Sequence, residues 1–105
     1  MSQVKIIILC AAGMSSSLIV NSMREAAEKQ GIDIDVHCQP SLNFKDADYS
    51  SVNVVLLAPQ VRGQAADIKA YLAGYDVAVG DIGMYEYGLV KGDLILKQAL
   101  SLAKK

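Results

Sequence analysis

The sequence contains no tryptophan, one histidine, two cysteines and no long apolar or charged segment. Its longest uninterrupted apolar run covers residues 6–12, far short of the roughly 20 residues that a helix needs to span a bilayer. The flanks of that run also lack the charged start and the small-residue cleavage site of a secretory signal. The 10 basic and 11 acidic residues form no block of one sign, which argues against a nucleic-acid footprint and a polybasic membrane anchor. We therefore expect a cytoplasmic protein that neither binds nucleic acid nor inserts into the membrane.

The 105 residues predict one compact domain over residues 1–105, which we expect to be monomeric. A chain of this size buries roughly two thirds of its unfolded surface and needs no disulfide to fold. Two cysteines in an intracellular chain are more typical of reactive or buried thiols than of a structural bridge. The sole histidine, His37, lies within a predicted strand, where we expect a structural or surface role. One histidine and two separated cysteines are too little for a metal site, so we expect neither metal nor cofactor.

Short apolar segments alternate with segments of helical periodicity along the whole chain. Strands are predicted at residues 4–9, 32–38, 52–57 and 77–79. Helices are predicted at residues 15–30, between residues 61 and 72, and from near Asp93, which can cap the first turn, to the end of the chain. Residues 40–51 have few apolar positions, so we expect a short or irregular helix in that crossover. The alternation predicts an α/β fold, a three-layer sandwich with a four-stranded parallel sheet between helices.

Cys10 lies at the carboxyl end of the first predicted strand, the edge of an open α/β sheet at which ligands bind. The small residues after it lead directly into a predicted helix, whose unpaired amides and dipole create a positive potential. That potential suits a phosphoryl group and favours a thiolate. We interpret Cys10 as the nucleophile and the following residues as its phosphate-binding loop: Ala11, Ala12, Gly13, Met14, Ser15, Ser16 and Ser17. The alternative is a buried cysteine at a strand end, followed by serines that only cap the helix.

Three segments carry a resemblance to a known family. Residues 7–17 resemble the active-site loop of the lactose/cellobiose-type IIB proteins of the bacterial phosphoenolpyruvate-dependent sugar phosphotransferase system. Residues 54–61 resemble that family's third strand and the loop after it, and Tyr87, Gly88 and Gly92 resemble the region before its last helix. The resemblance spans essentially the whole chain. It implies the strand order 2-1-3-4, as in low-molecular-weight tyrosine phosphatases.

The resemblance also implies an activity and partners. Cys10 would accept a phosphoryl group from a phosphohistidine of a IIA protein and pass it to a sugar held by the membrane permease IIC. The protein would then be a phosphotransferase that docks transiently at the inner face of the membrane. The chain leaves open whether it is free-standing or part of a longer IIB–IIC protein, although its ends look natural. It also leaves open the sugar, since lactose, cellobiose and chitobiose systems all fit.

The loops near the predicted site supply candidate partner contacts. Gln60 and Arg62 follow the third strand, and their alternative is an ordinary polar loop. Tyr85 and Tyr87 would form an aromatic docking surface or simply cover the edge of the core. Residues 80–86 look longer than the corresponding stretch of the family, which leaves the roles of Asp81 and Glu86 open, as well as which of these residues contact IIA and which IIC.

A phosphatase is the main competing interpretation, because low-molecular-weight tyrosine phosphatases use a loop of the same shape. Those enzymes carry the pattern Cys-x5-Arg, in which the arginine guanidinium group donates two parallel hydrogen bonds to the phosphoryl oxygens. The matching position here is Ser16, which carries no charge, and Asp81 is the only candidate for the general acid that a phosphatase needs. Both observations favour a carrier over a cysteine phosphatase or an arsenate-reductase-like enzyme. A non-catalytic anion-binding module is a third interpretation.

Cys38 lies near the carboxyl end of the second predicted strand, which we expect to neighbour the first. It is interpreted as a small core residue. The alternative hypothesis is that oxidation joins it to Cys10 and blocks activity.

Overall fold

The computed structural model describes residues 3–11 and 15–103, with residues 15 and 16 described by their backbone alone. These residues form four strands, four α-helices and two 3-10 helices. In chain order they are β1 (Val4–Cys10), α1 (Ser15–Gln30), β2 (Ile34–Pro40), η1 (Ser41–Asp46), β3 (Val54–Leu57), η2 (Pro59–Gln64), α2 (Ala65–Leu72), β4 (Ala78–Asp81), α3 (Met84–Gly88) and α4 (Gly92–Ala103).

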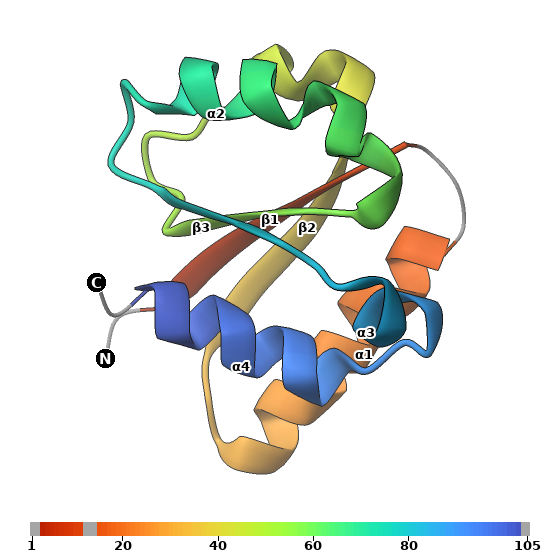
Figure 1. The fold of residues 1–105 in the computed structure, drawn as a ribbon. Coiled ribbons are helices and arrows are strands. Elements are labelled where there is room, and N and C mark those ends of the chain that lie inside the picture. Colours follow the sequence, from red (N-terminus) through yellow and green to blue (C-terminus); the bar gives the residue numbers. More distant parts are fainter. Residues whose placement is uncertain (1–2, 12–14, 104–105) are drawn as a thin grey trace.

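The four strands form one parallel sheet in the order β2-β1-β3-β4. Every crossover carries helical structure, and the helices cover both faces of the sheet. Figure 1 shows α2 and η1 on one face, with α1 and α4 on the other. The predicted α/β sandwich and its strand order are confirmed.

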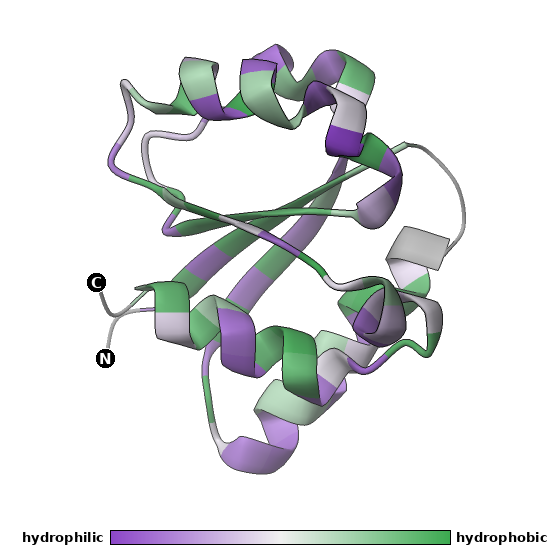
Figure 2. Ribbon diagram, in the orientation of Figure 1, coloured by the Kyte–Doolittle hydropathy of each residue, from purple (hydrophilic) through white to green (hydrophobic). Residues whose placement is uncertain are grey.

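Each face of the sheet has its own apolar layer, because successive side chains of a strand point to opposite faces. Ile6 and Ile8 of β1 pack in the layer under α1 and α4, together with Ile95. Leu9 packs in the opposite layer with Ile68 of α2. All four residues of β3 are buried, as expected of a strand covered on both sides. Figure 2 shows the mostly apolar character of this central strand.

Several element boundaries differ from the sequence prediction. The second strand begins at Ile34 rather than at Ile32, because the Ile32 amide still donates to the Ala27 carbonyl at the end of α1. The helix predicted after the third strand is divided into η2 and α2. The crossover at residues 40–51 contains only the short 3-10 helix η1, as predicted.

The segment before the last helix differs most from the prediction. It contains the short helix α3, which the sequence prediction missed. The last helix begins at Gly92, so Asp93 lies inside its first turn and not at the predicted capping position. The physical reason is a contact between helices: the Ser22 hydroxyl donates to the Val90 carbonyl at 3.2 Å and accepts from the Gly92 amide at 3.1 Å.

Candidate functional site

The carboxyl ends of β1, β3 and β4 meet at one edge of the sheet, and the first residue after β3 and the first residue after β4 are each hydrogen-bonded to the neighbouring strand. The Ala58 amide donates to the Leu9 carbonyl at 2.9 Å, and the Ile82 amide donates to the Leu57 carbonyl at 2.9 Å. Cys10, the last residue of β1, therefore lies at the edge of the sheet where the sequence predicts a site.

Cys10 is 3% exposed, and its Sγ lies 2.8 Å from the Sγ of Cys38 on β2. The Cys10 thiol also lies 3.9 Å from the Gln39 carbonyl oxygen. No disulfide joins the two cysteines, and Cys38 is only partly buried. The sequence predicts that their strands are neighbours, and the structure shows that the two side chains meet.

The loop after Cys10 is only partly described. Ala11 is an exposed residue in a bend directly after β1. The predicted loop residues Ala12, Gly13 and Met14 lie outside the described residues.

The last three residues of the predicted loop belong to the first turn of α1. The predicted loop residues Ser15 and Ser16 form the beginning of α1, and Ser17 is exposed in its first turn. That first turn carries no acidic side chain, so nothing within it opposes the positive end of the helix dipole. A helix N-terminus without a nearby carboxylate is suited to an anion.

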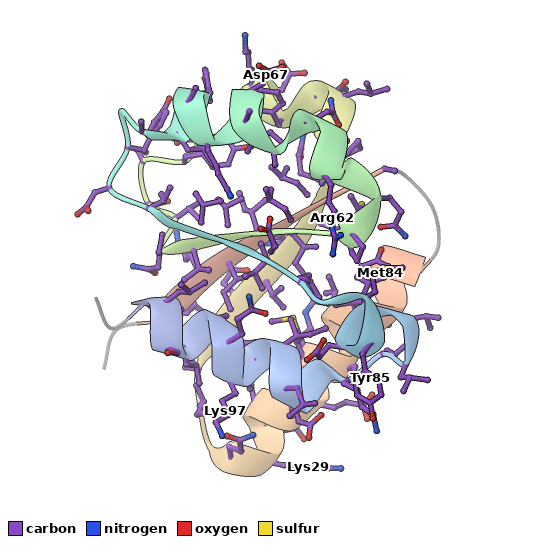
Figure 3. All side chains as sticks on the ribbon, viewed as in Figure 1. Lys29, Arg62, Asp67, Met84, Tyr85 and Lys97 are labelled. Atoms are coloured by element: carbon purple, nitrogen blue, oxygen red, sulfur yellow. The ribbon has the colours of Figure 1, made fainter. Side chains whose placement is uncertain are left out.

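A pocket of about 350 Å³ lies between η2 and α3 at the same edge of the sheet. Its walls are mostly apolar and bring three of the four predicted partner residues together. It is lined by Pro59, Gln60, Arg62, Met84, Tyr87 and Gly88. Figure 3 shows Arg62 and Met84 near each other at this end of the molecule.

The four predicted partner residues differ in exposure. Gln60 and Arg62 are exposed, and Tyr85 is 62% exposed on α3. Tyr87 is buried in the layer under α1 and α4, so it is a wall of the pocket and not part of a protruding aromatic surface.

Sequence reasoning missed Met84, which is 68% exposed at the start of α3. Two further exposed leucines, Leu18 at the start of α1 and Leu89 after α3, were also missed. Residue type alone does not show whether an apolar side chain is exposed. The exposure of Met84 could have been inferred only if helix α3 had been predicted.

The two carboxylates considered in the last loop have other neighbours. Asp81 ends β4, and its carboxylate lies 3.8 Å from the Lys69 ammonium of α2. The Glu86 carboxylate folds over Gly83, just before α3. Asp81 thus has a partner on α2, and Glu86 lies against its own helix start.

His37 is exposed on β2, and its Nε2 lies 2.6 Å from a carboxylate oxygen of Asp35. No group of three histidine, cysteine, aspartate or glutamate side chains that could hold a metal ion occurs among the described residues. In the same part of the chain, no helix is both long and apolar enough to cross a membrane.

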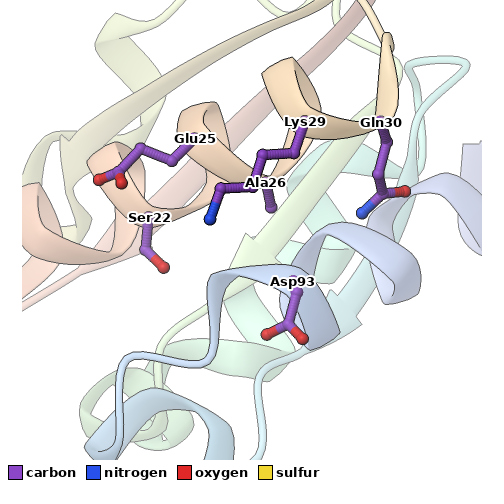
Figure 4. Close-up of a pocket in the computed structure, with 6 residues that line it drawn as sticks. All are labelled: Ser22, Glu25, Ala26, Lys29, Gln30 and Asp93. Atoms are coloured by element: carbon purple, nitrogen blue, oxygen red, sulfur yellow. The ribbon is translucent and has the colours of Figure 1, made fainter.

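A second pocket, of about 320 Å³, lies between α1 and α4. Figure 4 shows its lining, which includes Glu25 and Lys29 of α1 and Asp93 of α4. These charged side chains belong to the seam between two helices and not to the loops at the strand ends, so this pocket does not extend the site around Cys10.

Comparison with known proteins shows similarity to one family over most of the chain. The sequence profile of the family described as "PTS system, Lactose/Cellobiose specific IIB subunit" matches residues 5–98. The galactose-specific EIIB component of Lactococcus lactis subsp. cremoris is 36% identical over 104 residues, covering 92% of this chain and 94% of the relative. The oligo-beta-mannoside-specific EIIB component of Bacillus subtilis is 32% identical over 98 residues, covering 93% and 94%. The cellobiose-specific EIIB component of Lactococcus lactis subsp. lactis is 36% identical over 104 residues, covering 92% and 94%.

Solved structures share the fold. The lactose-specific IIB component domain of Streptococcus pneumoniae superposes with a TM-score of 0.84 at 21% identity, covering 96% of this chain and 98% of that one. The cellobiose-specific IIB component of Borrelia burgdorferi superposes with a TM-score of 0.80 at 23% identity, covering 98% and 94%.

Proposed function

The chain belongs to the lactose/cellobiose-specific IIB family of the sugar phosphotransferase system, a family of phosphoryl carriers, and on that premise we propose that Cys10 is the residue that carries the phosphoryl group. The observation that carries the proposal is the position of Cys10. It ends a central strand at the carboxyl edge of the sheet, five residues before a helix whose first turn holds no acidic side chain.

The proposed chemistry is two successive transfers. In the first, the Cys10 thiolate attacks the phosphorus of a phosphohistidine on a IIA protein, so that an S–P bond forms while the N–P bond breaks and neutral imidazole leaves. In the second, a sugar hydroxyl held by the membrane permease IIC attacks that phosphorus and gives up its proton to a base or to water, the S–P bond breaks, and the Cys10 thiolate is regenerated. Amides at the start of α1 stabilise the charge on the phosphoryl oxygens in both steps.

The carrier needs its phosphocysteine to last until the permease accepts the group. A phosphatase would place an arginine at the position of Ser16 and a general acid beside the leaving group. The sequence has serine there, and the Asp81 carboxylate lies near Lys69 on α2. Both features support slow hydrolysis of the phosphorylated cysteine.

We assign the partner contacts to the edge of the sheet that holds Cys10. Gln60, Arg62 and Met84 line the pocket there, and Tyr85 adds an exposed aromatic ring beside it. A IIA protein and the IIC permease would use this surface in turn, through small contacts that release quickly. The protein would act as one domain and one monomer over residues 1–105, docking transiently at the inner face of the membrane. The sugars named for its relatives, galactose, cellobiose and oligo-beta-mannosides, are the first to test.

The proposal is tested by phosphorylation in vitro. The protein is mixed with phosphoenolpyruvate, the general phosphotransferase proteins and candidate IIA partners, and phosphate that survives the acid treatment that destroys phosphohistidine is mapped. We expect label on Cys10 alone, none in Cys10→Ser, and unchanged labelling in Cys38→Ser. Full labelling of a Cys10→Ala variant would contradict the proposal, as would the absence of label with every partner.

A further inference from the structure

The contact between Cys10 and Cys38 serves no step of the transfer proposed above. Their sulfur atoms lie 2.8 Å apart, closer than two sulfurs in ordinary nonbonded contact, yet no disulfide joins them. The chain has no third cysteine. We propose that Cys10 and Cys38 form a reversible disulfide when the protein meets a peroxide, and that this bond blocks phosphoryl transfer. The block rests on the proposed function of Cys10, whereas the bond itself does not.

The strand register explains why the pair can close and reopen. Cys10 is opposite Pro40, and Cys38 is opposite Ile8, so the cysteines are diagonal neighbours on adjacent parallel strands. Both belong to the same side of the sheet, in the apolar layer under α1 and α4. A bond needs the sulfurs about 0.8 Å closer, at roughly 2.05 Å.

The required movement falls at the ends of two strands. Cys10 and Pro40 are the last residues of β1 and β2, so the adjustment need not disturb the middle of the sheet. Because diagonal neighbours are spaced more widely than directly opposed residues, the bond would carry strain, and strained disulfides are the more easily reduced.

The reaction balances with one peroxide molecule. A thiolate of the pair attacks the peroxide, so that an S–O bond forms, the O–O bond breaks, and hydroxide leaves to become water. The second sulfur then attacks the sulfenic acid, so that the S–S bond forms and the S–O bond breaks. Its proton leaves with the departing hydroxide as a second water. Two electrons pass from the sulfurs to the peroxide, and the product is the same whichever thiol reacts first.

The phosphorylated and disulfide-bonded states of Cys10 are mutually exclusive, because its single sulfur atom can form only one of the two bonds. Cys10 is 3% exposed, whereas the partly buried Cys38 gives a small oxidant a route to the pair. A phosphorylated Cys10 has no thiol to donate to a disulfide, and a disulfide-bonded Cys10 has no thiolate to accept a phosphoryl group. Phosphorylation would thus protect the pair, and oxidation would halt the carrier until a reductant restores it.

The experiment titrates the full chain with hydrogen peroxide and reads two signals. Non-reducing peptide mapping reports the bond, and labelling by phosphoenolpyruvate through the general proteins and IIA reports phosphoryl acceptance. We expect an intramolecular Cys10–Cys38 peptide pair whose yield rises as acceptance falls at least tenfold, with both changes reversed by dithiothreitol. Protein phosphorylated beforehand should resist the cross-link.

Cys38→Ser and Cys38→Ala are the matched variants. At the same dose they should show no intramolecular cross-link, and dimedone should trap the sulfenic acid on Cys10. Thiol loss without the Cys10–Cys38 peptide pair would overturn the proposal, and so would a cross-linked protein that still accepts phosphate. If reduced wild-type protein accepts no phosphate at all, the proposed function fails, while the peptide map still decides whether the bond forms.

Discussion

Tyr49 shows how burial changes a single side chain away from the site. It is 1% exposed, its hydroxyl donates to the Phe44 carbonyl, and its ring lies edge-on to Tyr71 and Tyr75, with ring centres 6.3 and 5.7 Å away. Burial, with smaller contributions from the Tyr71 and Tyr75 phenols, raises the pKa of Tyr49 to about 12 from its ordinary 10.0.

That shift makes the free energy of unfolding depend on pH. Below about pH 10 Tyr49 is neutral in both states, so its contribution to stability is fully present. As pH rises from 10 towards about 12, the unfolded chain ionises first, and this contribution is lost. We predict that Tyr49→Phe lowers stability by about 1 kcal/mol near neutral pH, because it removes the hydrogen bond to Phe44. Its stability should also fall less between about pH 9 and about pH 11.5 than that of the wild type.

Urea denaturation at the two pH values measures both effects. Tyr75→Phe is the comparison, since Tyr75 is 36% exposed and its pKa is raised chiefly by its hydrogen bond with Tyr71. Equal pH dependence in the wild type and Tyr49→Phe would contradict the assignment.

Arg62 and Met84 test the partner surface at the level of single residues. Both line the pocket between η2 and α3, and both are exposed, so truncating them removes little folded-state packing. We predict that Arg62→Ser and Met84→Ser each slow phosphoryl transfer from IIA about tenfold, equivalent to about 1.4 kcal/mol, because we expect both to belong to the minority of contact residues whose truncation costs more than about 1 kcal/mol.

Phosphoryl-transfer assays quenched at set times, at several IIA concentrations, measure that rate. Lys97→Ser is the control, because Lys97 is exposed on α4 and lines a different pocket. Thermal unfolding should be unchanged in all three variants. A slowdown in Lys97→Ser equal to that in Arg62→Ser would argue against a localised surface.

At the level of elements, the close approach of α1 and α4 depends on Gly92. A methyl group on Gly92 would collide with both the backbone and the side chain of Ser22, which also holds Val90 and Gly92 through its hydroxyl. The turn into α4 is tight, since Val90 has a φ of +54°, unusual for a β-branched residue.

We predict that Gly92→Ala destabilises the protein by about 2–3 kcal/mol, because the helices must separate to admit the methyl group. Gly74→Ala, at a turn with open space around the new methyl group, should change stability by no more than about 0.5 kcal/mol. Chemical denaturation of both variants provides the comparison. A Gly92→Ala variant as stable as Gly74→Ala would show that the helices adjust without cost.

The same elements show what could be predicted from sequence. Strands β1 and β3 were predictable because continuous β-branched runs have few alternatives, and α1 because its apolar spacing ends at Gly31, whose φ is +67°. The start of α4 was not predictable, because Ser22, which is 70 residues from Gly92, holds Val90 and Gly92 through its hydroxyl. A contact between residues so far apart in the chain cannot be predicted from the sequence around either residue.

The candidate site divides in the same way. The position of Cys10 was predictable because it ends a strand of a parallel sheet, and that of Arg62 because it follows the adjacent strand, whereas their roles stay predictions. The exposure of Met84 and the burial of Tyr87 depend on the orientation of α3. The meeting of Cys10 with Cys38 depends on register and side-chain direction, which the hydrophobic pattern alone does not specify.

For the whole molecule, the sheet separates two apolar layers, which we expect to unfold together. Ile68 under α2 and Ile95 under α4 are each fully buried, in different layers. We predict that Ile68→Val and Ile95→Val each cost about 1 kcal/mol, and that the double variant costs the sum to within about 0.5 kcal/mol.

Both the single variants and the double variant should keep one cooperative transition, as expected of a small domain. Denaturation followed by fluorescence and by circular dichroism tests this, since the two signals should coincide. Separate transitions for the two layers, or a large departure from additivity, would show that the sheet does not join them into one cooperative unit.

Cys10 and Cys38 are 28 positions apart in sequence, and all of α1 lies between them. A disulfide would therefore close residues 10–38 into a covalent ring, which restricts the unfolded chain by about 3–4 kcal/mol before any strain is subtracted. The oxidised protein would not transfer phosphoryl groups, and yet it would be more resistant to thermal unfolding and to proteolysis. After oxidative stress, the cell would therefore still contain folded, intact carrier, which would become active again once its thiols are reduced.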